Sequence, residues 1–359
     1  MTLSGGAQVL LYGAALAVPF VATLLSTPFA GRLAHRLDIL DHPTDERHHS
    51  RVTPYLGGVA VAIGVLVVGA FTATASGSGE LVTILFGAAA MFVIGVLDDR
   101  HDIGPITKVV VEVAAAVGLW FAGVRATPTG IVAIDLAITI LWVVGVTNAI
   151  NLLDNMDGLA SGFSAIAAAT LFVIAASNGD YLVGAFALAV AGASLGFLWH
   201  NFPPARIFLG DAGSLLLGFL LSSLALKLDL VNKTDAIRIL VPLLIFGIPI
   251  FDTFLVVITR VSESRPVYVG AVDHSSHRLS HRGLSSRAVA LVIYALQIVL
   301  SGLALAVLFV SDPVAIAIGV SVLVGAVICL FLLFRIRPHL VEALVDERET
   351  DPARPAEAP

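Results

Sequence analysis

The chain has 359 residues, of which 58% are hydrophobic and only 13% charged, and its mean hydropathy is +0.96. These values exclude an ordinary soluble domain and predict an integral membrane protein. The formal net charge of −6 is small, and the absence of a basic stripe with interleaved aromatic residues argues against a nucleic-acid partner.

Apolar runs recur along the chain, and a bilayer core needs about 20 residues per helix. We expect an all-α, polytopic membrane domain over residues 1–337, followed by a disordered cytoplasmic tail at 338–359 that has too little apolar content to fold. About eleven transmembrane helices are predicted near residues 7–29, 56–75, 80–97, 106–122, 131–149, 159–177, 182–199, 212–228, 237–258, 288–310 and 314–334.

The basic residues are divided unequally between the two sets of predicted loops. Of the 20 lysines and arginines, 16 fall on the side of the C-terminal tail and only 4 on the other side. The positive-inside rule therefore places the C-terminus in the cytoplasm and the N-terminus outside. All ten histidines lie on the predicted cytoplasmic side as well.

The third apolar run ends in the sequence DDRHDIGPITK, which places Asp98 and Asp99 side by side and Lys108 at the start of the next run. Adjacent carboxylates raise each other's pKa unless a metal or a basic side chain offsets their charge. The pair therefore indicates a cation site, although a solvated helix end with ordinary surface acids is the alternative.

The sequence TNAINLLDNMDGLASG spaces Asn148, Asn151, Asp154 and Asp157 at intervals of three, so that in a helix or tight turn they share one face. Such a stripe at the end of an apolar run is costly unless it lines a wet cavity. The alternative is a capped start of the next helix, but a cap requires only one of the four residues.

Two further polar segments follow on the same side. In WHNFPPARIFLGDAGS, Asn201 and Asp211 flank a Pro-Pro break, and an aspartate before a helix can hold a metal that bridges to phosphate, or can simply cap the helix.

In DHSSHRLSHRGLSSR, His274, His277 and His281 alternate with Arg278 and Arg282. The spacing permits zinc, whereas the arginines favour phosphate binding by their forked donors. A basic amphipathic segment lying on anionic lipid is the third interpretation.

These clusters gather at helix ends on one membrane face, which favours an enzyme. A secondary transporter would place its ionisable groups near the midplane. A transporter and a non-catalytic lipid-binding scaffold remain the alternatives from other functional classes.

In order, DHPTDERHHSRVTPYLGG, DDRHDIGPITK, NAINLLDNMDGLASG, FLGDAGS and DHSSHRL resemble the motifs of the polyprenyl-phosphate N-acetylhexosamine-1-phosphate transferases, over residues 41–287. The resemblance implies transfer of a phosphosugar, preferably N-acetylglucosamine 1-phosphate, from a UDP-N-acetylhexosamine to a polyprenyl phosphate, with release of UMP. Muropeptide-1-phosphate transfer is the alternative within the family.

The resemblance also implies Mg²⁺, with Mn²⁺ as a substitute, a site on the cytoplasmic face of the plasma membrane, and a homodimer. The product would initiate a cell-envelope glycan such as lipopolysaccharide or teichoic acid. We expect the prenyl chain beside residues 243–260, with Asp252 and Arg260 at the cytoplasmic end of its groove.

By resemblance, the catalytic residues are Asp98, Asp99, Asp154, Asp157, His274 and His277. The metal-site residues are Asn151 and Asp211. The substrate-binding residues are Arg47, His49, Lys108, Asn148, Asn201, Arg278 and Arg282. The chain departs from the family pattern at Ser276, where a histidine is usual, at Glu112, where glutamine is frequent, and at Glu46 and Arg47, where an Arg-Lys pair is usual.

Overall fold

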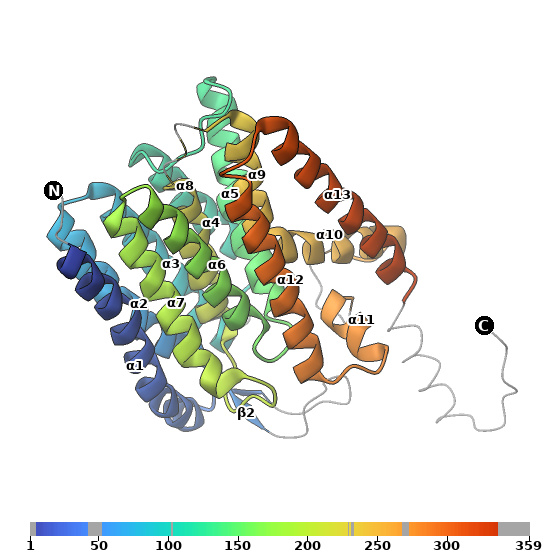
Figure 1. Cartoon of the computed structure of the whole chain (residues 1–359). Coiled ribbons are helices and arrows are strands. Elements are labelled where there is room, and N and C mark those ends of the chain that lie inside the picture. The colour runs from blue at the N-terminus through green and yellow to red at the C-terminus, as the bar shows by residue number, and fades with distance from the viewer. Residues whose placement is uncertain are drawn as a thin grey trace, which may run out of the picture.

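The computed structural model describes residues 5–41, 52–101, 103–228, 230, 233–267 and 273–336. In these residues the chain forms thirteen helices and one small sheet (Figure 1). The helices are α1 Gly5–Leu37, α2 Gly57–Ser76, α3 Gly79–His101, α4 Pro105–Phe121, α5 Val132–Leu153, α6 Leu159–Ser177, α7 Tyr181–Asn201, α8 Gly210–Leu226, α9 Asp235–Ile245, α10 Gly247–Ser262, α11 Ser275–His281, α12 Ser286–Ala306 and α13 Asp312–Phe334. The strands β1 Leu40–Asp41 and β2 Thr53–Pro54 pair antiparallel, Leu40 opposite Pro54.

Helices α6, α7 and α8 form the centre of the bundle. Most residues of α7 and nearly all residues of α8 are buried, with α1, α2 and α6 packed on α7 and α3 and α5 packed on α8. Small residues permit this close packing: a Cβ added to Gly192 of α7 would lie 2.2 Å from the Leu16 carbonyl oxygen of α1. The central helices therefore bury most of their apolar surface inside the protein, and the outer helices α1 and α13 bury much less of theirs.

Seven described helices are long and apolar enough to cross a membrane: α1, α3, α5, α6, α7, α12 and α13. The pair α9–α10 would make an eighth span, and α2 and α8 contain shorter apolar stretches. The predicted all-α, multi-pass membrane protein is therefore confirmed. The finer count of eleven spans stays a prediction.

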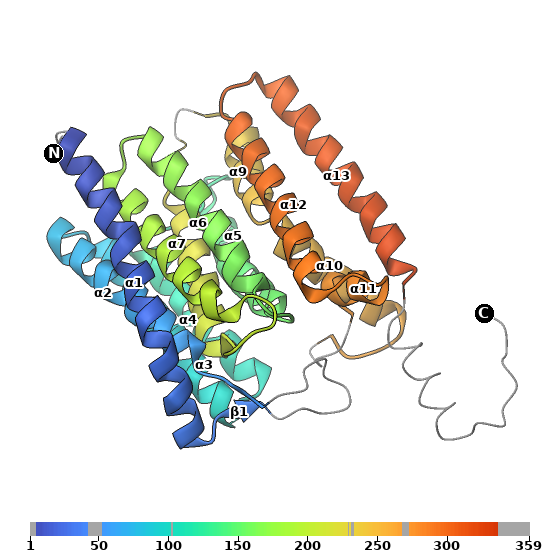
Figure 2. The ribbon, with the colours of Figure 1, turned by 60° about the horizontal axis from the view of Figure 1, so that its bottom comes forward.

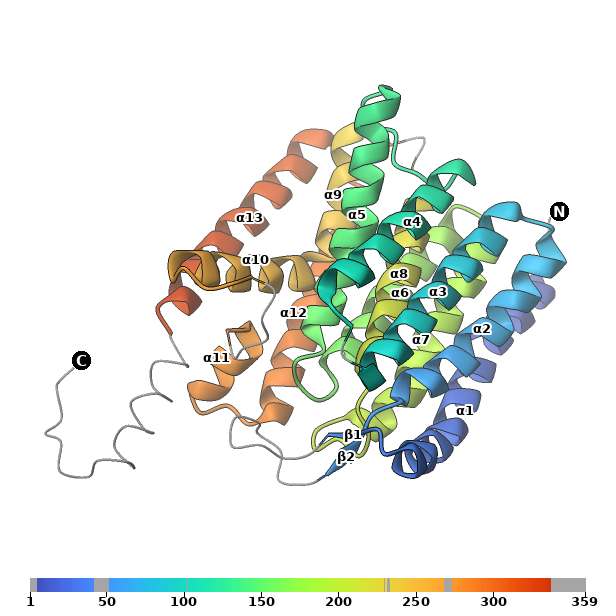
Figure 3. The same ribbon diagram turned by 180° about the vertical axis from the view of Figure 1, so that it is seen from behind.

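The predicted continuous helix over 237–258 is instead broken. Helix α9 ends at Ile245, α10 begins at Gly247, and the two meet at 73°. Pro242 and Pro249 each lack the backbone N–H that an unbroken helix needs. Gly247, between them, loses more conformational entropy than other residues when it is fixed in a helix. Together these residues explain the break. Helix α10 consequently crosses the direction of its neighbours (Figure 3).

Helices α9 to α13 form a second group beside the central bundle, with α13 at its outer edge (Figure 2). The last turn of α3, the α5–α6 loop and α11 lie toward one end of the molecule (Figure 3). Most of the predicted site residues therefore come together at that end. Arg47, His49 and the tail 338–359 lie outside the described residues.

Candidate active site

Four helix ends meet in a group of polar side chains that we call the acidic site. Its members are Asp98 and Asp99 from the last turn of α3, Lys108 from the first turn of α4, Asn151 from the last turn of α5, Asp154 directly after α5, and Asp211 from the first turn of α8. The structure brings these residues together from distant motifs, as the contacts described next show.

Lys108 lies at the centre of the acidic site. Its Nζ is 2.9 Å from Asp98 Oδ2 and 2.8 Å from Asp211 Oδ2, so one ammonium bridges two carboxylates. Asn151 Nδ2 donates to the other oxygen of Asp211 at 2.9 Å. The Lys108, Asp98 and Asp211 side chains are 20%, 13% and 26% exposed, which leaves them within reach of a bound molecule.

The two adjacent aspartates have different contacts. Asp98 faces Lys108 and accepts the Ile103 N–H at 2.7 Å. Asp99 accepts the N–H of Asp211 at 2.7 Å and of Ala212 at 3.2 Å, and so places a carboxylate at the positive N-terminus of α8. Asp98 is therefore available to a substrate, whereas Asp99 fixes the helix that carries Asp211.

Gly210 allows the Asp99 carboxylate to lie this close to the start of α8. Its φ is +71°, a value that other residues rarely adopt, and a Cβ at this position would lie 2.6 Å from Asp99 Oδ2. A larger residue would therefore strain the backbone and displace the Asp99 carboxylate. The first glycine of the GDAGS motif is thus required by the contact between α3 and α8.

Asp154 adds a further carboxylate to the acidic site. Burial, followed by the charges of Asp211 and Asp99, raises the pKa of Asp154 well above its usual value. The acidic site thus contains four carboxylates and one ammonium. A cation bound here would oppose this rise in pKa, because it stabilises the ionised form of the carboxyl groups.

The donor set fits a hard divalent cation with few protein ligands. Carboxylate and amide oxygens suit Mg²⁺, and Lys108 already supplies a positive charge to Asp211. Among the described residues no three His, Cys, Asp or Glu side chains form a ready-made metal cage. Mg²⁺ commonly uses only one or two carboxylates and takes its remaining ligands from water and substrate phosphates, so a site in which Asp211 and Asn151 were the protein ligands would be compatible with this ion.

Asp157 and Asn201, predicted as catalytic and substrate-binding residues, make supporting contacts. Asp157 Oδ2 accepts the Ala205 N–H at 2.8 Å. Asn201 is buried, accepts the Gly158 N–H at 3.0 Å, and donates to the Ile207 carbonyl oxygen at 3.0 Å. These bonds join the α5–α6 loop, which carries Asp154, to the connection between α7 and α8, which precedes Asp211. They therefore support two segments of the acidic site.

A hydrogen bond joins the histidine segment to the loop beside the acidic site. Ser276 Oγ donates to Asn155 Oδ1, next to Asp154, so the serine that replaces the usual histidine links α11 to the α5–α6 loop. His274 is buried and its Nδ1 lies 2.7 Å from Asp252 Oδ2. The half-buried His277 ring is centred 6.0 Å from that of His274.

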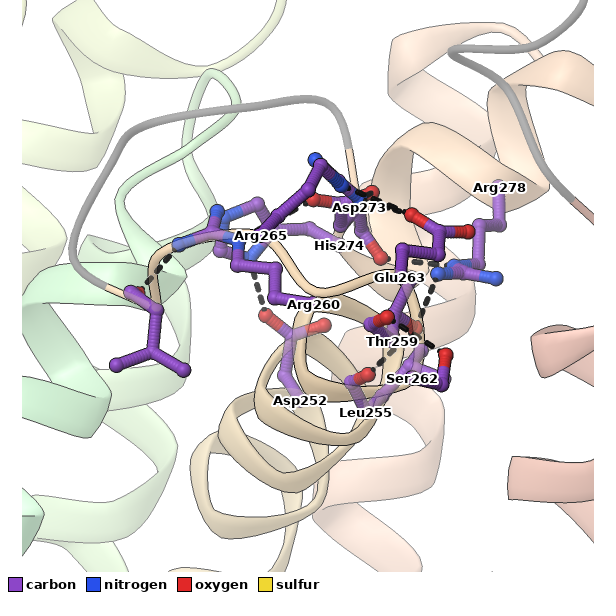
Figure 4. Close-up of polar contacts among 11 residues, drawn as sticks. Asp252, Leu255, Thr259, Arg260, Ser262, Glu263, Arg265, Asp273, His274 and Arg278 are labelled. Carbon is purple, nitrogen blue, oxygen red and sulfur yellow. Dashed lines mark hydrogen bonds and ion pairs between the residues drawn. The ribbon is translucent and has the colours of Figure 1, made fainter.

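A second group of charges lies around α10 and α11, and we call it the arginine cluster: Arg260, Arg265 and Arg278 with Asp252 and Asp273 (Figure 4). Asp273 is fully buried and accepts from Arg260 Nε at 3.2 Å and from Arg265 Nη2 at 2.8 Å. Asp252 and Arg260 are thus engaged with the segment before α11, so no contact assigns them to the predicted prenyl groove.

Arg278 was predicted to neutralise a diphosphate, but its guanidinium is fully buried in the arginine cluster. It donates to the Asp273 carbonyl oxygen at 2.7 Å, to Thr259 Oγ1 at 2.7 Å and to the carbonyl oxygens of Leu333, at 2.8 Å, and Ile336. These partners take four of its five N–H groups, and the residue joins α10, α11 and the segment at the end of α13. Arg282, by contrast, is exposed.

Asn148 has a partner that the motifs did not identify. Its Nδ2 donates to Glu112 Oε2, and also to the Val144 carbonyl oxygen at 2.9 Å. Glu112 lies in α4, one turn after Lys108, and its side chain is fully buried. A lone carboxylate within an apolar run was the signal in the sequence that would have placed Glu112 at the site.

The chain is similar to proteins of described activity. The sequence profile of glycosyl transferase family 4 matches residues 81–229. A probable undecaprenyl-phosphate N-acetylglucosaminyl 1-phosphate transferase from Bacillus subtilis is 36% identical over 300 residues, which cover 80% of this chain and 82% of that protein.

Two other relatives have related names. The decaprenyl-phosphate N-acetylglucosaminephosphotransferase of Mycolicibacterium smegmatis is 29% identical over 355 residues, covering 89% of this chain and 87% of that protein. A phospho-N-acetylmuramoyl-pentapeptide-transferase of Bacillus subtilis is 29% identical over 267 residues, covering 67% and 80%.

Proposed function

Because the chain belongs to the polyprenyl-phosphate N-acetylhexosamine-1-phosphate transferase family, we propose that its acidic site transfers N-acetylglucosamine 1-phosphate from UDP-N-acetylglucosamine to a polyprenyl phosphate, and releases UMP. The observation that carries the proposal is the Lys108 ammonium held between Asp98 and Asp211 at a junction of helix ends. This arrangement provides both a cation for phosphate and carboxylates for a metal.

The reaction requires two anions to meet. An oxygen of the lipid phosphate attacks the β-phosphorus of the nucleotide sugar, and the bond from that phosphorus to the UMP oxygen breaks. Lys108 neutralises phosphate oxygens as they approach, while Asp98 orients the lipid phosphate and accepts its proton. Asp99, on α3, accepts a hydrogen bond from the first turn of α8 and so keeps Asp211 in place.

Asp211 and Asn151 would hold Mg²⁺ at this site, with Mn²⁺ as a substitute. When bound, the metal would offset the charge of the diphosphate and favour departure of UMP. The carboxylate-rich composition of the acidic site supports this proposal, because hard oxygen ligands prefer Mg²⁺.

We place the acidic site on the cytoplasmic face, with eleven spans, the N-terminus outside and the C-terminus inside, because 16 of 20 basic residues lie on that side. Cysteines introduced at two exposed positions in a Cys329→Ser background test this topology. Ser177→Cys should react with an impermeant maleimide from outside, and His281→Cys only after permeabilisation. The opposite pattern would reverse the assignment of the faces.

The leaving group tests the chemistry directly. Purified protein given prenyl phosphate, UDP-N-acetylglucosamine and Mg²⁺ should form UMP and a prenyl diphosphate sugar in equal amounts. Added UMP should reverse the reaction, because one phosphoanhydride is exchanged for another. UDP as the product would contradict phosphosugar transfer, and turnover only with UDP-N-acetylmuramoyl-pentapeptide would favour the muropeptide branch. The proposed homodimer is tested by the molecular mass in detergent.

A further inference from the structure

Glu112 is a buried carboxylate with an unused oxygen. Its side chain is fully buried in α4, and Oε2 accepts from Asn148. Within the described part of the chain, Oε1 has no hydrogen-bond partner. A buried carboxylate is costly unless it is paired, so this oxygen is ready to accept a donor.

Lys108 is the donor best placed to reach it. The two residues are four apart in α4, so their side chains are neighbours on one helix face. The lysine side chain is flexible and its ammonium carries three N–H groups. Two of these groups account for the contacts with Asp98 and Asp211.

A divalent cation and Lys108 compete for Asp211. The ammonium lies 2.8 Å from Asp211 Oδ2, where a metal bound by this carboxylate would repel it. Lys108 can keep its contact with Asp98 but needs a second acceptor in place of Asp211. Among its neighbours on α4, Glu112 supplies an unused carboxylate oxygen.

We propose that Glu112 is a positioning residue that receives the Lys108 ammonium when a divalent cation takes Asp211. The inference rests on the metal site of the proposed function and adds an exchange of partners to it. In the absence of a cation Lys108 bridges Asp98 and Asp211. With the cation bound, Lys108 bridges Asp98 and Glu112, and every charge keeps a partner.

Glu112→Gln separates this role from a purely structural one. The amide oxygen of glutamine still accepts from Asn148 and the side chain keeps its shape, while the charge that receives Lys108 is lost. Lys108 would then hold Asp211 more firmly against the cation. We expect the cation to bind about tenfold more weakly to this variant, a size typical of coupling between contacting charges.

The binding experiment uses Mn²⁺ as the probe, and the electron paramagnetic resonance signal of the free ion measures its affinity for the full chain in detergent. Glu112→Gln is compared with Lys108→Gln and with the double variant. If the exchange occurs, Glu112→Gln has no further effect once Lys108 is absent. A direct attraction between Glu112 and the cation would instead give the same loss in both backgrounds, and would overturn the proposal.

Glu80→Gln provides the matched control. Glu80 lies at the opposite end of α3 and pairs with Lys227 at 2.6 Å, so its replacement should leave Mn²⁺ binding unchanged. Unchanged affinity in folded Glu112→Gln would reject the exchange while the UMP assay still supported the transferase. If the wild-type chain bound no Mn²⁺, the exchange would be rejected as well, and UMP formation would independently test the transfer reaction.

Discussion

The acidic site and the arginine cluster are both rich in charge, but their charges are balanced differently. In the arginine cluster, Asp273 is fully buried between two guanidinium groups, and Arg278 donates mainly to backbone carbonyl oxygens. In the acidic site the one ammonium is partly exposed and contacts two of the four carboxyl groups, those of Asp98 and Asp211. A buried charged group whose donors and acceptors already have fixed partners stabilises structure, whereas a partly exposed charged group can attract ligands.

The comparison shows that residue type alone does not predict the contacts of Arg278. An arginine beside histidines is typical of a phosphate site. In the structure, however, its donors meet fixed acceptors on α10 and at the end of α13. The role of a charged residue therefore depends on whether its donors or acceptors still lack partners in the folded chain.

The largest expected effect is the loss of turnover in Asp211→Asn. The amide keeps the size of the side chain but weakens the attraction for Lys108 and for a cation, so the rate of UMP release should fall by about 10² or more. Thermal unfolding should change little, because Asp211 is partly exposed. The control is Asp235→Asn, in an exposed pair with Arg238. Normal turnover in Asp211→Asn would remove this residue from the mechanism.

Gly210→Ala should have the next largest effect. The added Cβ would lie 2.6 Å from Asp99 Oδ2 at a φ of +71°, so Asp99 must move away from the start of α8. We expect kcat to fall by about tenfold or more, since misplaced catalytic groups are costly. Gly130→Ala is a matched control, because Gly130 has the same φ of +71° but no atom within 4 Å of the added Cβ. Equal losses in both variants would attribute the effect to backbone strain alone.

Asp273→Asn in the arginine cluster should act on stability. The change leaves two guanidinium groups without their buried anion, and breaking such a pair costs about 3 to 5 kcal/mol. The melting temperature in detergent at pH 7 should therefore fall, whereas Asp235→Asn at the exposed pair should cost less than about 1 kcal/mol. A wild-type melting temperature for Asp273→Asn would show that the arginine cluster contributes little to stability.

The pH dependence of stability tests the contribution of Asp273 further. Burial would raise the pKa of Asp273, but hydrogen bonds from Arg265 and Arg260 outweigh burial and lower it below its usual value. A lowered pKa stabilises the folded state fully above the unfolded pKa of about 3.9, and this stabilisation is lost as the pH falls through the lower folded pKa. The wild-type chain should therefore lose stability below about pH 4, and Asp273→Asn should lack this component of the loss.

The sequence predicted the fold class and the membership of the acidic site because both depend on local signals. Apolar runs predicted helices at 80–97 and 131–149, close to α3 and α5, and polar residues at their ends predicted where the site would form. The bend between α9 and α10 also had a signal, in Pro242, Gly247 and Pro249. Its angle of 73° depends on packing against other helices, which no local pattern contains.

The individual roles were less predictable, because they depend on partners distant in the chain. Asp98 and Asp99 are neighbours in sequence, yet one faces Lys108 and the other the start of α8. The hydrogen bonds of Arg278 depend on the carbonyl oxygens of Leu333 and Ile336, which lie far along the chain. In the sequence, Glu112 stands out only because it occupies a position where glutamine is frequent. Its burial and its oxygen without a hydrogen-bond partner become visible only when α4 packs on α5.

The contact between Arg278 and Ile336 also constrains the order of biosynthesis. The two residues are 58 positions apart, and a ribosome that adds 5–20 residues per second needs about 3 to 12 seconds to travel between them. During that interval the guanidinium of Arg278 is without its acceptors at Leu333 and Ile336. The contacts that Arg278 of α11 makes with this segment can therefore be completed only after Ile336 has been synthesised.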